Sequence, residues 1–183
     1  MGTIKVHLFT TVDGVVDAPM WTSGYGFTEG MGRAIGNICD PDGAILLGRT
    51  TYEMFAPVWS TRTAEDDPGA PFFNETPKYV VSSTLANAGW TNSTVLGGYD
   101  AGRIREFKDS IDGGVYVSGS ATLVRALIAD GLADELHLFV YPVAVGTGIR
   151  LFPEGTAQTP LSLAGCESFD NGVVHLTYCP SAG

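Results

Sequence analysis

The segment from Ala44 to Glu53 constrains the fold most, because it joins a buried strand to a helix through a single glycine. Its sequence is Ala-Ile-Leu-Leu-Gly-Arg-Thr-Thr-Tyr-Glu. The apolar run predicts a buried strand, Gly48 breaks it, and Arg49 with the two threonines opens a helix. Such a turn points the free N–H groups of a helix start outward, which favours an anion there. The segment therefore predicts an α/β protein that binds a phosphate-bearing cofactor.

The charge balance makes any phosphate site a local exception. The chain carries 20 acidic and 10 basic residues, a formal net charge of −10. Nucleic acid is an unfavourable partner because its phosphates would be repelled. A length of 183 residues with 44% hydrophobic residues fits one domain, residues 1–183, with a substantial core. No apolar run approaches the ~20 residues of a membrane span, and a strand-like pattern begins at once, so we expect a cytoplasmic protein without a signal peptide.

Neither the cysteines nor the histidines have the spacing of a metal site. The three cysteines lack a CxxC pair, which fits a reducing compartment without a disulfide framework. His7, His137 and His175 each lie in an alternating, strand-like run without HxH or HExxH spacing. We therefore expect strand residues that face solvent or make a hydrogen bond, and no bound metal.

Strand-like and helix-like segments alternate along most of the chain. Strand patterns cover residues 3–10, 44–47, 78–82, 94–96, 114–117 and 135–140, and helical patterns cover residues 28–38, 50–55, 101–111 and 122–130. Residues 161–169 and 173–179 flank Asp170-Asn171-Gly172, which predicts a closing antiparallel hairpin. We expect a three-layer α/β/α fold whose mixed, mostly parallel central sheet ends in this hairpin.

Three small, hydroxyl-rich loops follow predicted strands, where open α/β sheets bind their ligands. They are Gly48-Arg49-Thr50, Ser82-Ser83-Thr84 and Gly119-Ser120-Ala121-Thr122. Each loop alone also fits a simple turn, and neither a GxGxxG nor a Walker sequence follows a strand. Together the loops predict a phosphate site at one edge of the sheet.

Two polar stretches, residues 11–25 and 57–77, are long enough to act as lids over that edge. The apolar residues between 140 and 145 predict an exposed sheet edge through which two subunits could pair. Tyr52 and Phe55 follow the Gly-Arg turn and fit either stacking on a planar ring or packing in the core.

Several of these residues carry a resemblance to a known family. Residues 47–53 resemble the MGR-x-T-[WY]-E segment of dihydrofolate reductases, and residues 80–83 resemble their V-L-S-S strand. The tract from residue 115 through Gly131-Leu132-Ala133-Asp134-Glu135-Leu136 to residue 152 is similar to the reductase domain of bacterial riboflavin biosynthesis. The chain is thereby identified as a dihydrofolate-reductase-like protein of the riboflavin-reductase C-terminal type.

The resemblance implies an NADPH-dependent reductase, with the cofactor phosphates held by residues of the three loops. Gly48, Arg49 and Thr50 would meet the phosphates, Ser82 and Ser83 would lie near the adenosine 2′-phosphate, and residues 119–122 would wrap the pyrophosphate. Arg49 would supply the charge that selects NADPH over NADH. Arg103 is a second candidate for that role, or else a solvated helix residue. Domains of this type also imply a homodimer.

The implied catalytic residues are less regular. Dihydrofolate reductases place a carboxylate early on their first helix, and Glu29 is the acid nearest that place. Asp13, at the end of the first strand, could orient a substrate or donate a proton through water, although Asp13-Gly14 also fits a turn. Trp21 resembles the loop tryptophan that covers the reductase active site, and it also fits simple packing of a long loop.

The implied substrate is a small planar heterocycle, pterin-like or aminouracil-like, or a carbonyl or imine compound. Ser118 stands where riboflavin-pathway reductases carry a glutamate. The alternative is a nucleotide-binding module of the same fold without catalysis. A flavin or deazaflavin in the same cleft also stays open.

Overall fold

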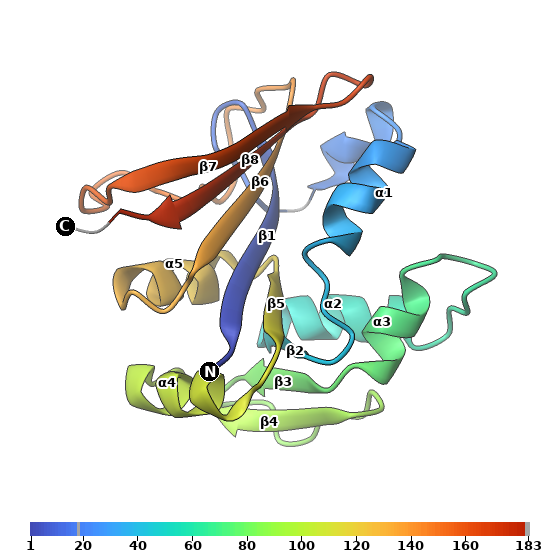
Figure 1. Cartoon of the computed structure of the whole chain (residues 1–183), viewed down its shortest axis with the longest axis vertical. Coiled ribbons are helices and arrows are strands. Elements are labelled where there is room, and N and C mark those ends of the chain that lie inside the picture. Colours follow the sequence, from blue (N-terminus) through green and yellow to red (C-terminus); the bar gives the residue numbers. More distant parts are fainter. Residues whose placement is uncertain (18, 182–183) are drawn as a thin grey trace.

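The computed structural model describes residues 1–17 and 19–181, which form one eight-stranded sheet with helices on both faces (Figure 1). The strands are β1 (Thr3–Thr11), β2 (Ala44–Gly48), β3 (Lys78–Val81), β4 (Ser93–Gly97), β5 (Gly114–Ser118), β6 (Glu135–Tyr141), β7 (Leu161–Ser168) and β8 (Val174–Pro180). Their order is β4-β3-β2-β5-β1-β6-β8-β7. Neighbours from β4 to β6 pair in parallel, and β8 runs antiparallel to β6 and β7. The predicted mixed, mostly parallel sheet with a closing hairpin is confirmed.

The helices divide into two groups by the apolar layer that each covers. They are the 3₁₀ helix η1 (Pro19–Gly24), α1 (Glu29–Gly36), α2 (Arg49–Trp59), α3 (Ala70–Glu75), α4 (Ala101–Ser110) and α5 (Ala121–Ala129). α1, α2 and α3 bury Met31, Tyr52 and Phe73 in one layer, whereas α4 and α5 bury Ile104 and Leu127 in the other. None of the helices in the described residues is both long and apolar enough to cross a bilayer.

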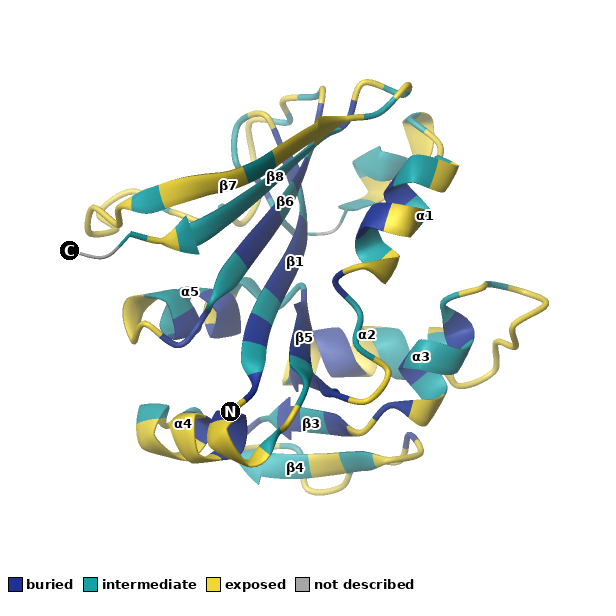
Figure 2. Cartoon of the chain, in the orientation of Figure 1, coloured by how far each residue is buried: buried dark blue, intermediate teal, exposed yellow. Residues whose placement is uncertain are grey.

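Alternation along β1 explains why the sheet supports two layers. Ile4, Val6 and Leu8 point toward α4 and α5, whereas Phe9 packs in the layer under α1 and α2. The central strands β1, β2 and β5 are almost entirely buried, and β7 is mostly exposed (Figure 2). Because side chains alternate across a strand, a residue at position 7 shares its face with Phe9.

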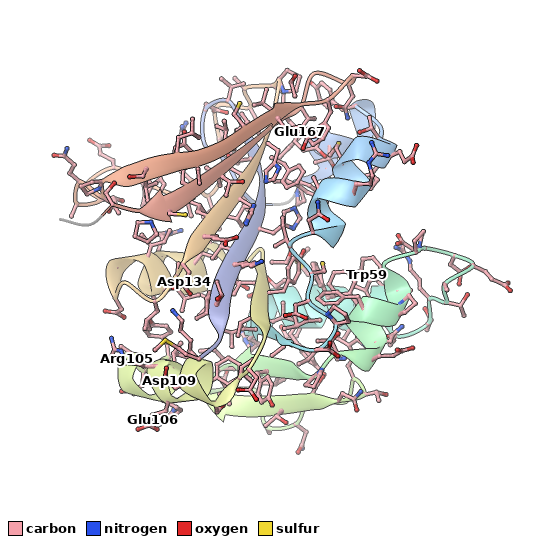
Figure 3. The ribbon with its side chains drawn as sticks, in the orientation of Figure 1. Trp59, Arg105, Glu106, Asp109, Asp134 and Glu167 are labelled. Carbon is pink, nitrogen blue, oxygen red and sulfur yellow. The ribbon has the colours of Figure 1, made fainter. Side chains whose placement is uncertain are left out.

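The family-like tract around residues 131–136 has a structural role. Gly131, at φ +64°, follows the end of α5 in the left-handed conformation that favours glycine. Asp134, labelled in Figure 3, accepts the Ile4 N–H at 2.7 Å and lies 2.6 Å from the Lys108 ammonium group. The tract therefore joins the start of β1 to α4 and α5, away from the loops that were predicted to bind phosphate.

Two expectations about the periphery are wrong. Residues 57–77 are not one long loop, because α2 continues through Pro57 to Trp59 and residues 70–75 form α3. Trp59 and Phe73 stack at a centroid distance of 4.2 Å, and this apolar contact holds the two helices together. Residues 140–145 do not form a sheet edge either, because β8 pairs with β6 along Leu136–Val140. On that side the outermost strand is β7.

Candidate functional site

A cleft of about 790 Å³ lies at the carboxyl ends of β1, β2, β3 and β5. In the sheet, β5 lies between β1 and β2. The strands β2, β3 and β4 extend the sheet on one side of β5, and β1 and β6 extend it on the other, so the strand order reverses at this point. Crevices at such reversals are the usual ligand sites of open α/β sheets. The cleft wall includes residues 48–51, 82–84 and 118–123, so the structure brings the three predicted loops together.

The loops after β2 and β5 interlock through Ser120. Its Oγ accepts the Gly48 N–H at 2.9 Å and lies 2.6 Å from Thr51 Oγ1. A Cβ on Gly48 would lie 2.8 Å from that Oγ, and a Cβ on Gly119 would lie 3.2 Å from Thr51 Oγ1. Gly119 also has φ +60°. Glycine is therefore needed at both positions for the starts of α2 and α5 to approach closely and share one cleft wall.

Arg49 is the first residue of α2 and, in the part of the chain that the structure describes, the one Arg or Lys on the cleft wall. Its side chain is half exposed and lies 3.8 Å from Glu53 Oε1, one turn along the helix. An ion pair so open to solvent restrains the guanidinium weakly. Arg49 can therefore turn toward an anion that also meets the helix start.

The two serines of the loop after β3 have different roles. Ser82 Oγ accepts the N–H groups of Thr84 and Leu85 at 3.2 and 2.9 Å, so it closes the turn. Ser83 is exposed on the cleft wall. The structure thus leaves the Ser83 hydroxyl open to a ligand, whereas the Ser82 hydroxyl already serves the backbone.

Tyr99 adds an aromatic ring to this end of the cleft, beside Gly98. Its hydroxyl donates to Asp130 Oδ2 at 2.7 Å, which ties the end of β4 to the end of α5. Burial, together with this carboxylate, raises the pKa of Tyr99. The predicted alternative cation, Arg103, donates instead to the carbonyl oxygens of Leu96 and Gly98, both at 3.1 Å. Arg103 is not among the cleft-lining residues of the described chain.

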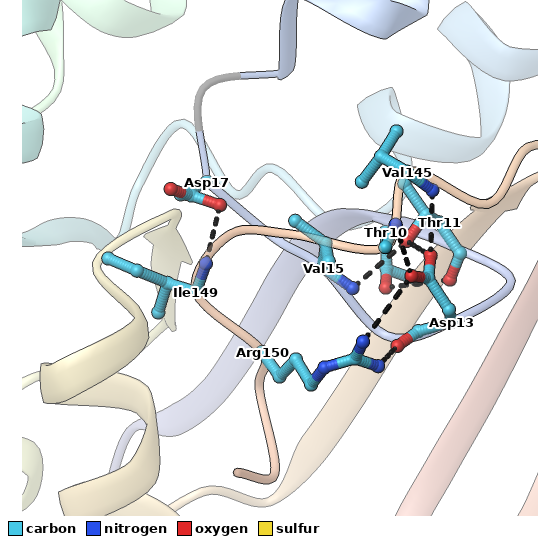
Figure 4. Close-up of polar contacts among 9 residues, drawn as sticks. Thr10, Thr11, Asp13, Val15, Asp17, Val145, Ile149 and Arg150 are labelled. Carbon is cyan, nitrogen blue, oxygen red and sulfur yellow. Dashed lines mark hydrogen bonds and ion pairs between the residues drawn. The ribbon is translucent and has the colours of Figure 1, made fainter.

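Asp13 does not line the cleft but holds two loops together (Figure 4). Its carboxylate accepts the Thr11 hydroxyl at 2.6 Å and the Gly146 N–H at 2.8 Å, and it lies 3.5 Å from Arg150 Nη2. The Thr11 hydroxyl and then the Gly146 amide lower the pKa of Asp13 to about 2. Arg150 also donates to the Asp13 carbonyl. These bonds give Asp13 a structural role and leave it without a place on the cleft wall.

Glu29 and Trp21 also lie off the described cleft wall. The Glu29 side chain is 90% exposed and pairs with Arg33 at 2.9 Å on the surface of α1. Trp21 packs edge-on against Tyr141 at a centroid distance of 5.2 Å, in the apolar layer under α1. Glu29 thus faces solvent, and Trp21 packs like a core residue at the base of its loop.

Sequence reasoning missed Asp17, the acid that does line the cleft. Its Oδ1 accepts the Ile149 N–H at 2.8 Å (Figure 4). A Cβ on Gly148 would lie 2.6 Å from that oxygen. The loops 12–17 and 143–150 are thus joined by the Asp13 and Asp17 carboxylates as well as by backbone hydrogen bonds such as Val16 N–H to Ile149 O. Of the two carboxylates, only Asp17 lines the cleft. No local signal marks it, because its partner lies 132 residues away.

The ring-shaped side chains divide between core and cleft. Tyr52 is buried, and its hydroxyl accepts the Trp90 N–H at 2.9 Å, so it is a core residue. Phe55, one turn further along the face, lines the cleft with Met54 and Phe9. This end of the cleft is therefore apolar and suited to a planar ring, in contrast to the hydroxyl-rich end.

His7 is the polar group of this apolar end. It lines the cleft and is 5% exposed, and its Nδ1 lies 2.7 Å from the Tyr116 hydroxyl. Burial, and then His137 and His175 on the same sheet face, lower the pKa of His7 to about 3. His7 is therefore neutral at physiological pH. Of the two roles expected for this strand histidine, facing solvent or making a hydrogen bond, the structure shows the hydrogen bond.

The cleft lies where the order of the parallel strands reverses at β5, and two helix starts meet there, which is the usual place for a ligand in an open α/β sheet. The chain belongs to the RibD C-terminal domain family, whose model matches residues 3–175. It is 29% identical over 130 residues to the uncharacterized protein YwjB of Bacillus subtilis (strain 168), covering 70% of this chain and 69% of that protein.

Solved structures show the same fold. A putative riboflavin biosynthesis protein from Shewanella sp. PV-4 superposes with a TM-score of 0.71 at 18% identity, over 100% of both chains. Dihydrofolate reductase from Enterococcus faecalis, complexed with NADP(H) and RAB-propyl, superposes with a TM-score of 0.65 at 15% identity, over 99% of this chain and 98% of that one. The resemblance to dihydrofolate-reductase-like and riboflavin-reductase-like proteins is therefore confirmed, and it supports a reductase-type function.

Proposed function

We propose that this protein is an NADPH-dependent reductase that acts on a small planar heterocycle or on a carbonyl or imine compound. The single observation that carries the proposal is the interlock of the two helix starts at Gly48, Gly119 and Ser120, with Arg49 beside them. Helix N-termini joined in this way favour a bound phosphate. The family, and the NADP(H) in the Enterococcus reductase, support the nature of that phosphate.

The residues present fit a dinucleotide. A Cβ at Gly48 or Gly119 would crowd the interlock, so the glycines keep the backbone close to the cleft. Ser83, Thr84 and Tyr99 line the end assigned to the adenosine part, and Thr50, Ala121 and Thr122 line the wall assigned to the pyrophosphate. When bound, the cofactor supplies a hydride. Phe9 and Phe55 provide the apolar surface that excludes water around the reacting rings.

Calorimetry with NADPH and with NADH tests the cofactor. We expect wild-type protein to bind NADPH more tightly, and Arg49→Ala to weaken NADPH binding about tenfold while affecting NADH less. Arg33→Ala is the matched control, because Arg33 also pairs with a glutamate one turn away but lies on α1, off the described cleft wall. If neither nucleotide releases heat with the wild type, the proposal is wrong.

The alternative is a nucleotide-binding module without catalysis. It is favoured by one observation, that neither Asp13 nor Glu29 reaches the described cleft wall. Oxidation of NADPH in the presence of ring carbonyl compounds and imines separates the two functions. Binding without turnover over such a panel would favour the module.

We also propose a cytoplasmic homodimer that pairs through β7. This strand spans Leu161–Ser168, is mostly exposed, and carries one charged residue, Glu167. Long exposed edges with few charges tend to pair with another strand. Sedimentation should show a dimer that Leu163→Lys weakens, since Leu163 is 57% exposed on this strand. A wild-type monomer at micromolar concentration would contradict the pairing.

A further inference from the structure

The His7 imidazole carries an atom that the fold does not use. His7 Nε2 is buried and has no hydrogen-bond partner among the described residues. An unpaired buried polar atom is costly, and in a native structure it calls for a reason such as a ligand or a catalytic role. The same side chain lines the apolar end of the cleft. The unpaired nitrogen thus belongs to a residue that lines the end of the cleft suited to a planar ring.

Tyr116 determines which kind of hydrogen bond Nε2 can make. The Tyr116 side chain is 2% exposed, and its hydroxyl lies 2.7 Å from His7 Nδ1. The Ser118 hydroxyl also lies within hydrogen-bonding reach of the Tyr116 phenol. We infer that the phenol proton goes to Nδ1, its partner at 2.7 Å. A neutral imidazole that accepts at Nδ1 carries its own proton at Nε2. On this inference the pair holds a buried N–H donor at His7, a residue of the cleft wall.

The surroundings keep this donor neutral and oriented. Phe9 and Phe139 pack edge-on against the imidazole at centroid distances of 4.8 and 5.1 Å. Ser118, the residue paired with His7 on β5, is the nearest other polar side chain on this face and also lines the cleft. His137, His175, Thr177, Glu135 and Lys5 lie on the same face, and the first two oppose a positive charge on His7. Phe9 is half-buried and lines the cleft beside the imidazole. Because Nε2 is buried, a ligand reaches it only after a neighbouring side chain such as Phe9 moves.

We propose that His7 Nε2–H binds a carbonyl oxygen of the substrate, with Tyr116 as its positioning residue. This inference rests on the proposed reductase function and names its substrate class: a neutral, planar ring that bears a carbonyl group. A hydrogen bond from a neutral donor polarises such an acceptor without transferring a proton. A diamino ring carries amino groups where the dione carries carbonyl oxygens, so at those positions it would place N–H donors against the His7 N–H and bind more weakly.

Nitrogen NMR of the histidine side chains tests the tautomer without any cofactor. We expect His7 to be a neutral Nε2–H tautomer between pH 5 and 8. The signal is assigned by its loss in His7→Gln. In Tyr116→Phe the phenol donor is gone, so we expect a mixture of the two tautomers. An Nδ1–H tautomer in the wild type would overturn the proposal.

Binding of a matched pair of probes tests the substrate class. Lumazine is a neutral pteridine dione, and 2,4-diaminopteridine is its diamino counterpart. We expect lumazine to bind at least about tenfold more tightly and to shift the His7 nitrogen signals. His7→Leu should weaken lumazine about tenfold, and His7→Gln, which keeps a neutral N–H donor, should restore most of that loss. Failure of lumazine to bind, or equal binding by His7→Leu and the wild type, would overturn the proposal.

A second histidine provides the matched control. His137 lies on the same sheet face and is also buried, but it is off the described cleft wall. We expect His137→Gln to bind lumazine like the wild type. NADPH affinity, measured in parallel, should be unchanged in His7→Leu. If the wild type does not bind NADPH, the proposed function is wrong. If the wild type binds NADPH but lumazine affinity is the same in the His7 variants, only this inference is wrong.

Discussion

The two ends of the cleft differ in how far apart along the chain their residues lie. At the phosphate end, Gly48, Arg49 and Thr51 are neighbours in one turn, and two long-range hydrogen bonds join this turn to Ser120. At the ring end, His7 and Tyr116 are 109 residues apart and meet only because β1 and β5 pair. The first end offers backbone amides and one half-exposed cation, and the second offers a buried, neutral donor among aromatic rings. A short motif can therefore identify the cofactor end, whereas the ring end depends on the register of the sheet.

The largest expected difference between the two ends is in their response to acid. The folded pKa of His7 is about 3 against 6.5 for the unfolded chain, so below pH 6.5 the unfolded state binds a proton that the folded state refuses. The free energy of unfolding should then fall by about 1.4 kcal/mol per pH unit, or roughly 3 kcal/mol by pH 4, from this group alone.

Urea unfolding between pH 7 and pH 4 measures this dependence. His7→Gln should have a shallower slope by about one proton, and Arg49→Ala should keep the wild-type slope because it changes only the phosphate end. Identical slopes in the wild type and His7→Gln would show that His7 is not buried in the neutral form.

The next largest effect is expected at Gly119. Gly119→Ala places a side chain at φ +60° and 3.2 Å from Thr51 Oγ1, so it disturbs the interlock of α2 and α5. We expect NADPH to bind roughly tenfold to a hundredfold more weakly, measured by calorimetry.

Gly131→Ala is the control for backbone strain. Gly131 has φ +64°, and a Cβ there meets no atom within 4 Å in the described chain. It should lower the free energy of unfolding by about 1 kcal/mol and leave NADPH affinity unchanged. Equal losses of NADPH affinity in the two variants would mean that backbone strain, and not the interlock of the α2 and α5 starts, determines NADPH binding.

A smaller effect is expected from Ser120→Ala, which keeps the backbone but removes the hydroxyl between the two helix starts. The Gly48 N–H then loses its 2.9 Å partner, and we expect a loss of about 1 kcal/mol in stability and threefold to tenfold in NADPH affinity. Thermal unfolding and calorimetry measure the two quantities. Ser110→Ala, which removes a hydroxyl bonded to Phe107 O at the end of α4, should change stability without changing affinity.

The smallest effect is expected from Glu29→Gln. The side chain is 90% exposed and pairs only with Arg33 in the described structure, so we expect less than about a twofold change in NADPH and lumazine affinity. The same variant should keep its turnover with any substrate found. A hundredfold loss of turnover would instead make Glu29 the helix carboxylate of the reductase mechanism.

The sequence predicted the sheet, the closing hairpin and the three loops because each has a local signal. Apolar alternation marks the strands, Asp170-Asn171-Gly172 marks the hairpin, and small residues mark the turns. The sequence could not predict the end of α2, because Pro57 usually ends a helix and here does not. Stacking of Trp59 on Phe73 outweighs that local preference.

The candidate site was predictable only in its cofactor half. The role of Ser82 differs from the simple expectation, because its hydroxyl is already bonded to Thr84 and Leu85. Asp17 and His7 reach the cleft through partners more than 100 residues away, and no spacing in the chain records such contacts. The carboxylates at Asp13 and Glu29 were plausible by proximity in sequence, but their neighbours in space are Arg150 and Arg33.

The carboxylate and backbone hydrogen bonds between residues 12–17 and 143–150 mean that the two loops move together at the rim of the cleft. A deletion or insertion between Val143 and Ile149 would be transmitted to Asp17, and so to the mouth of the cleft, without touching any wall residue of the cofactor end. Variation in the length of that distant loop is thus a route by which related chains can reshape what enters, while the dinucleotide half stays constant.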